Sequence, residues 1–149
     1  MAKGALSWIM KLRDVEREQE AARMAVEHFM RSLHDGNVQL EPHLKRIHVG
    51  QLSANLEGTF VIRMFSEFEL SLKLFLNEKH QAVPAKIKPR MNRVANLVGF
   101  KGAALDDAHK ARRYRNKVVH HLDEGIDPLT LRRVTSFLCT YLDKLQKDW

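Results

Sequence analysis

The chain has 149 residues, a length typical of one domain, and 44% of them are hydrophobic, which is enough to bury a core. Its single cysteine, Cys139, excludes an internal disulfide framework and a multi-cysteine zinc site, and no apolar run reaches membrane-spanning length. The formal net charge of +7 favours an anionic partner. Because the chain has a single cysteine and residues 1–10 carry no signal-peptide core, we expect a cytoplasmic protein.

Hydrophobic periodicity predicts two long helices in the first half of the chain. Apolar residues recur at spacings of three and four over residues 5–34, and Gly36 follows the end of this pattern. Residues 38–50 are expected to form a connector, and a second helix should begin at Ser53, as its N-cap, and run to about His80. The residues expected to face the core are Leu6, Ile9, Leu12, Val15, Ala22, Ala25, Val26, Phe29 and Leu33 in the first helix and Ile62, Phe65, Phe68, Leu72, Phe75 and Leu76 in the second.

Three further helices are predicted in the second half of the chain. A short basic helix covers about residues 90–98, and the next runs over about residues 104–121. The last begins with Asp127 as N-cap and Pro128 at its first helical position, and it ends near Gln146. Their expected core residues are Met91, Val94, Leu97 and Val98, and then Leu131, Val134, Phe137, Leu138, Tyr141, Leu142 and Leu145. The elements together predict an all-α fold, a compact bundle of four main helices and one short helix.

The positive charge is concentrated in one segment. Residues 84–121 carry 10 basic and 2 acidic side chains, whereas residues 1–83 carry 11 of each and residues 122–149 carry 4 basic and 5 acidic. A positive zone attracts a polyanion by releasing its counterions, without reading its bases. We therefore expect a nucleic acid to bind this segment; a solvated basic face with no partner is the alternative interpretation.

The sequence Arg115-Asn116-Lys117-Val118-Val119-His120 lies in this segment, near the end of a predicted helix, and His121 follows it. An arginine that binds a phosphate and a histidine that moves a proton suffice to cut RNA without a metal. Five helical residues turn by about 140°, so one helix aims the two side chains apart, and two copies related by a two-fold axis could bring them together. In the alternative interpretation, the arginine makes surface ion pairs and the histidine caps backbone carbonyls.

Chance alone produces such spacings, and Arg23 and His28 form a second pair of this kind in the charge-neutral half of the chain. We interpret that pair as structural. His34, His43 and His48 surround the first connector, but their spacing matches no standard metal site. No metal or other cofactor is therefore expected.

The motif resembles the R-x(4–6)-H signature of the HEPN superfamily, in which a polar residue often follows the arginine. Residues 63–76 also resemble the earlier long HEPN helix with its F-E-x-x-L core, and the resemblance covers most of residues 51–146. It implies a HEPN-like core over residues 51–146 of a single domain over residues 1–149, preceded by a helix and connector over residues 1–50.

The resemblance further implies a metal-independent endoribonuclease, usually a homodimer, of the kind common among bacterial toxins and phage-defence effectors. Arg115 would stabilise the scissile phosphate, Asn116 would orient a neighbour, and His120 would transfer a proton, with His121 as the alternative histidine. The products would be a 2′,3′-cyclic phosphate and a 5′-hydroxyl. The cations expected to anchor RNA around the motif are Lys110, Arg112, Arg113 and Lys117.

The sequence leaves three points open: the role of two carboxylates, whether the protein is catalytic, and whether an antitoxin binds it. Glu67 and Glu69 lie on the earlier helix either near the cleft or on a solvated face, paired with Arg63 or Lys73. The chain could also be a non-catalytic HEPN-like module that binds nucleic acid, a nucleotide or a partner protein, or a plain dimerisation protein. An acidic antitoxin could cover the basic segment.

Overall fold

A computed structural model describes residues 4–121 and 125–149 of the chain. Over these residues the chain forms five α-helices and no β-strand, which confirms the predicted all-α fold. The helices are α1 (Ala5–His34), α2 (Arg46–Glu78), α3 (Ile87–Val98), α4 (Ala103–His120) and α5 (Leu131–Asp143). None of the described helices combines the length and the apolar composition needed to cross a membrane.

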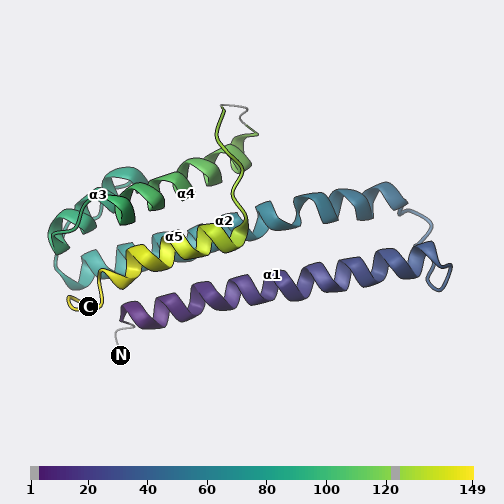
Figure 1. The fold of residues 1–149 in the computed structure, drawn as a ribbon, viewed down its shortest axis with the longest axis horizontal. Coiled ribbons are helices and arrows are strands. Elements are labelled where there is room, and N and C mark those ends of the chain that lie inside the picture. Colours follow the sequence, from purple (N-terminus) through teal and green to yellow (C-terminus); the bar gives the residue numbers. More distant parts are fainter. Residues whose placement is uncertain (1–3, 122–124) are drawn as a thin grey trace.

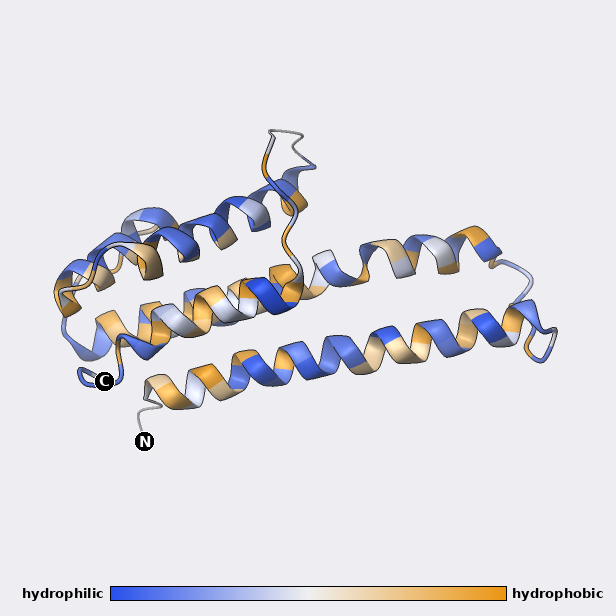
Figure 2. Ribbon diagram, viewed as in Figure 1, coloured by the Kyte–Doolittle hydropathy of each residue, from blue (hydrophilic) through white to orange (hydrophobic). Residues whose placement is uncertain are grey.

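Helix α2 is the centre of the bundle, because it contacts each of the other four helices. It runs antiparallel to α1 along the length of the molecule (Figure 1). Helix α5 packs against both α1 and α2, and α3 and α4 cover the remaining side of α2. Figure 2 shows the contrast in composition, since α4 is mainly hydrophilic and α5 carries more hydrophobic residues, interspersed with near-neutral ones.

Aromatic side chains from α2 and α5 form the middle of the core. Phe65 and Phe68 of α2 are fully buried and meet edge to face, and Phe68 makes the same contact with Tyr141 of α5. The Tyr141 hydroxyl donates a hydrogen bond of 2.6 Å to the carbonyl oxygen of Met91, so α5 is tied to α3 within the core. This bond satisfies a polar group that would otherwise be costly to bury.

Most of the predicted core residues are buried, with informative exceptions. The six expected residues within α5 and Leu145 just after it are all buried, as are five of the six in α2. Leu6, Ala25 and Leu97 were expected to face inward, but all three are exposed, Leu6 by 60% and Leu97 by 45%. In α1 the buried stripe begins with Ala5 and Trp8, one position away from Leu6, and this shift turns Leu6 by about 100° away from the core.

Two predicted helix starts are wrong. Helix α2 begins at Arg46 rather than after Ser53, and His48 Nδ1 accepts a hydrogen bond of 3.0 Å from the Lys45 backbone N–H at its start. The first turns of α2 pack only beside α1, so their apolar residues do not follow the periodicity that a core imposes.

Helix α5 begins at Leu131 rather than after Asp127. Its N-cap is Thr130, whose hydroxyl accepts a hydrogen bond of 3.1 Å from the Arg133 backbone N–H. Glu57 of α2 adds a second cap, because its carboxylate accepts a hydrogen bond of 2.6 Å from the Leu131 backbone N–H. A carboxylate at this end also suits the helix dipole, so a residue 74 positions away in sequence reinforces the start that Thr130 marks.

Gly58 lies where α2 passes close to the end of α4. A Cβ atom at this position would lie 3.0 Å from the Val118 Cγ1 atom, closer than side chains normally approach. The absence of a side chain at Gly58 therefore lets the last turns of α4, which carry the motif, pack directly on α2.

Candidate functional site

Helix α4 is built to present cations while it packs closely on the bundle. Its buried residues are Ala104, Ala108 and Ala111, and such small side chains allow neighbouring helices to approach. Asp106 in its first turn favours the positive end of the helix dipole, and Lys117 and His120 favour the negative end. The remaining positions are mostly polar and partly exposed, and five residues of the helix are lysine or arginine, so α4 carries a cluster of cations.

Arg115 is held against α2 by contacts on several sides. Its side chain is 25% exposed, and its guanidinium lies over the Phe65 ring, 5.9 Å from the ring centroid. One terminal nitrogen lies 3.7 Å from a carboxylate oxygen of Glu69, and the other donates a hydrogen bond of 3.1 Å to the Asn116 Oδ1 atom. The Nε atom is buried and donates to no described residue. The guanidinium is thus oriented but retains unused hydrogen-bonding capacity.

His120 and His121 lie at the exposed end of the same helix. His120 is the last residue of α4, and its side chain is exposed. His121 follows as the C-cap in the left-handed conformation, with φ of 51°. Glycine is the usual residue in that conformation, so His121 has a strained backbone role that His120 does not share.

The two ends of the motif lie on different sides of α4. Arg115 shares its side with Arg112, and both line a hollow beside the start of α3. His120 follows Arg113 by seven residues, nearly two full turns, and Arg113 lines a separate hollow beside α5. A single protomer therefore brings Arg115 and Asn116 together but turns His120 away from them.

The predicted RNA-binding cations are divided between these two sides. Lys110 makes an ion pair of 2.7 Å with Asp107 and lines the α5 hollow with Arg113. Lys117 donates a hydrogen bond of 2.9 Å to the carbonyl oxygen of Ile126, so it holds the segment that leads to α5. Arg112 faces the α3 hollow. Of the four cations, Arg112 alone joins Arg115.

A chain of hydrogen bonds supports Arg112. Its Nε atom donates to the His109 Nδ1 atom at 3.4 Å, and His109 Nε2 lies 2.8 Å from the Asn92 Oδ1 atom. Burial lowers the pKa of His109, and the charges of Arg112, Arg113 and Lys88 lower it further, while Asp106 opposes them. A neutral His109 can accept from Arg112 through Nδ1 and donate to Asn92 through Nε2. Helices α3 and α4 are thereby linked at the edge of the hollow.

The two carboxylates of the earlier helix have different partners from those expected. Glu67 pairs with Lys11 of α1 at 2.6 Å, while Glu69 faces Arg115. Arg63, an expected partner of Glu67, instead pairs with Glu18 of α1. Helix periodicity alone could not distinguish these pairings, because they depend on which helix packs beside each face of α2.

Two other sequence patterns have a plain structural account. Arg23 forms exposed ion pairs with Glu20 and Glu27 on its own helix, which favours the structural interpretation of the Arg23 and His28 pair. Within residues 4–121 and 125–149, no three histidine, cysteine or acidic side chains gather as a metal site would require.

Sequence reasoning did not identify two cations that line the α3 hollow. Lys86 and Lys88 flank the start of α3, whereas Glu69 of α2, which also lines the hollow, had been expected either near the cleft or on a solvated face. The two lysines could have been found from their spacing before Pro89 inside the basic segment.

Comparison of the chain with models of protein families, with curated proteins and with solved structures finds no match.

Proposed function

We propose that the protein is a HEPN-type endoribonuclease that cleaves RNA in the cytoplasm to 2′,3′-cyclic phosphate and 5′-hydroxyl ends. One observation carries most of the weight: Arg115 is oriented by Asn116 at the edge of a cationic hollow, and a histidine lies on the same helix. An arginine held by Phe65, Glu69 and Asn116 on the same helix as an exposed histidine is what supports this proposal.

The chemistry assigned to these residues is transesterification within the RNA. The 2′-hydroxyl attacks the adjacent phosphorus, the bond to the 5′-oxygen breaks, and the phosphate closes into a ring. Arg115 stabilises the charge that develops on the phosphate oxygens, and Asn116 holds the guanidinium in place. His120 accepts the proton of the 2′-hydroxyl or donates one to the 5′-oxygen, a role suited to imidazole near neutral pH.

A second protomer completes the site in this proposal. Arg115 and His120 lie on different sides of α4, so the arginine of one protomer and the histidine of its partner would act on one phosphate. Mixing Arg115→Ala and His120→Ala proteins tests this directly. Mixed dimers contain one intact composite site, so about a quarter of the wild-type activity should return. Two inactive proteins that stay inactive on mixing would contradict a shared site.

The cleavage test uses a mixed-sequence RNA in EDTA, with wild-type protein and His120→Ala compared at equal concentration. Wild type should release fragments with cyclic phosphate ends, and a matched oligonucleotide with 2′-deoxyribose throughout should stay intact. Cleavage that survives the substitution would remove His120 from the mechanism. Salt-dependent binding with no turnover by either protein would favour the non-catalytic binding module instead.

The setting proposed for this activity is a toxin or a phage-defence effector. An enzyme that cuts cellular RNA needs a restraint, and the excess of 10 basic over 2 acidic residues in 84–121 suits an acidic regulatory protein. Such a partner should inhibit cleavage and compete with RNA for α4. Inhibition that persists while RNA still binds would place the partner elsewhere.

A further inference from the structure

The hollow beside α3 is the most strongly cationic concavity described in the molecule. It is an open depression with a volume of about 490 Å³, a size within the range of ligand sites in proteins. It lies where the first turn of α3 meets the middle of α4, with α2 at its edge. Its lining residues are Glu69, Lys86, Ile87, Lys88, Pro89, Arg112, Arg115 and Asn116.

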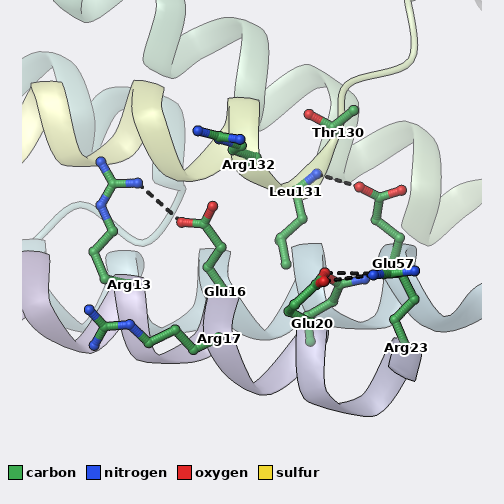
Figure 3. Close-up of a pocket in the computed structure, with 10 residues that line it drawn as sticks. Arg13, Glu16, Arg17, Glu20, Arg23, Glu57, Thr130, Leu131 and Arg132 are labelled. Carbon is green, nitrogen blue, oxygen red and sulfur yellow. Dashed lines mark hydrogen bonds and ion pairs between the residues drawn. The ribbon is translucent and has the colours of Figure 1, made fainter. Parts of the chain in front are cut away.

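A larger hollow elsewhere provides a contrast in charge. It encloses about 610 Å³ between α1, α2 and the start of α5 (Figure 3). Its arginines are mostly neutralised, because Arg13 pairs with Glu16, Arg17 with Asp14, and Arg23 with Glu20 and Glu27. Size alone therefore does not identify an anion site here.

The α3 hollow lacks such compensation. Four cations line it against one carboxylate, and that carboxylate, Glu69, stands 3.7 Å from Arg115. Lys86 and Lys88 form no ion pair with any described residue. Several uncompensated cations facing one concave surface favour a ligand that carries negative charge.

The backbone on the α3 side adds to this preference and is held rigidly. Ile87 and Lys88 occupy the first turn of α3, where the backbone N–H groups have no hydrogen-bond acceptor within the helix. Arg90 fixes the preceding loop, because its guanidinium donates to the carbonyl oxygens of Pro84 and Ala85 at 3.0 to 3.2 Å. Arg90 is therefore a structural cation that orders one wall of the hollow.

We propose that this hollow binds the RNA backbone phosphate next to the scissile one, through Lys86, Lys88 and Arg112. Arg115, which would hold the scissile phosphate in this proposal, lines the same hollow as these three cations. A strand that places its scissile phosphate at Arg115 therefore brings a neighbouring phosphate towards Lys86, Lys88 and Arg112. The hollow thus sets where a single strand enters the site, and this assignment rests on the proposed ribonuclease function.

The experiment measures binding without cleavage. Fluorescence anisotropy of a labelled single-stranded RNA is followed against salt concentration for His120→Ala protein, with and without Lys86→Ala and Lys88→Ala. Loss of one phosphate contact should weaken binding about five- to tenfold at low salt and reduce the slope of log affinity against log salt by about 0.7. The matched control removes two charges, Arg17→Ala and Arg132→Ala, from the larger hollow and should leave the slope unchanged.

Each outcome separates this inference from the ribonuclease proposal. If the lysine variants bind RNA more weakly but the wild-type protein never cleaves RNA, the hollow binds phosphate and the ribonuclease proposal is wrong. Active wild type with lysine variants that bind RNA like the control would overturn the phosphate site alone. If wild type cleaves, a methylphosphonate next to the cleaved bond should weaken binding to His120→Ala but add no further loss to the lysine variant. Additive losses would place that phosphate outside the hollow.

Discussion

Arg115 and His120 belong to one helix, yet the molecule treats them differently. Arg115 is fixed by Phe65 and Glu69 from α2 and by Asn116 from its own helix. His120 is exposed at the helix end. Contacts within one protomer thus fix the position of the arginine, whereas the histidine side chain is exposed and accessible to a neighbouring molecule. In the proposed site, the arginine would therefore be preorganised, whereas the histidine would be placed by assembly or by the substrate.

Arg115→Lys is expected to have the largest effect. Lysine keeps the charge but loses the planar fork that can contact Asn116 and a phosphate together, so kcat/KM for RNA should fall about 100- to 1000-fold. Steady-state kinetics would measure the loss, and circular dichroism would show that the helices persist. Activity within a few fold of wild type would mean that the guanidinium geometry is unimportant.

Glu69→Gln is expected to tighten RNA binding about three- to fivefold at low salt. The substitution removes the carboxylate that shares Arg115 with an incoming phosphate, and it also removes a negative charge from the cationic hollow. Glu67→Gln is the matched control, since Glu67 pairs with Lys11 instead. Weaker binding by Glu69→Gln would show that the carboxylate positions the arginine more than it competes for it.

His121→Gly separates the two adjacent histidines. Glycine adopts the left-handed conformation at this C-cap without strain, so the variant should be about 1 kcal/mol more stable and cleave RNA within twofold of wild type. Denaturant unfolding and the cleavage assay test both statements. Loss of cleavage in a stabilised variant would transfer the catalytic role to His121.

The smallest expected effect concerns the support of Arg112. Because the pKa of His109 is lowered in the folded protein, its imidazole binds a proton at a higher pH in the unfolded chain than in the folded one. Stability should therefore be complete above the ordinary histidine pKa of about 6.5 and decline below it. His109→Gln removes this contribution, so between pH 7.5 and 5.5 its Tm should fall about 1–2 °C less than that of wild type. Equal declines would show that His109 does not titrate differently in the fold.

The local sequence pattern predicted those helices well that pack against the hydrophobic core. The apolar stripe of α5 is buried as expected because three helices surround it, and Tyr141 reaches from it to Met91 of α3. The start of α5 lies at a local cap, Thr130, that the sequence contains, whereas the second cap from Glu57 could not be predicted because it comes from far away in sequence. The start of α2 was missed because no core shapes its first turns.

The candidate site divides in the same way. The chain reveals Arg115, Asn116 and the basic segment directly, since these are adjacent in sequence. It does not reveal that Arg112 and Arg113 face different hollows, or that Glu69 opposes Arg115, because both facts depend on how α4 packs against α2 and α5. Lys86 and Lys88 join the site only through the turn that places α3 beside α4.

The contact between Gly58 and Val118 makes these two positions a single steric unit. A methyl group at position 58 would raise helix propensity by about 1 kcal/mol but would press on the Val118 side chain 3.0 Å away. Volume gained at one position must be given up at the other, so related chains with a larger residue at 58 should carry a smaller one at 118. A double-mutant cycle of Gly58→Ala and Val118→Ala would measure this interdependence as a coupling free energy.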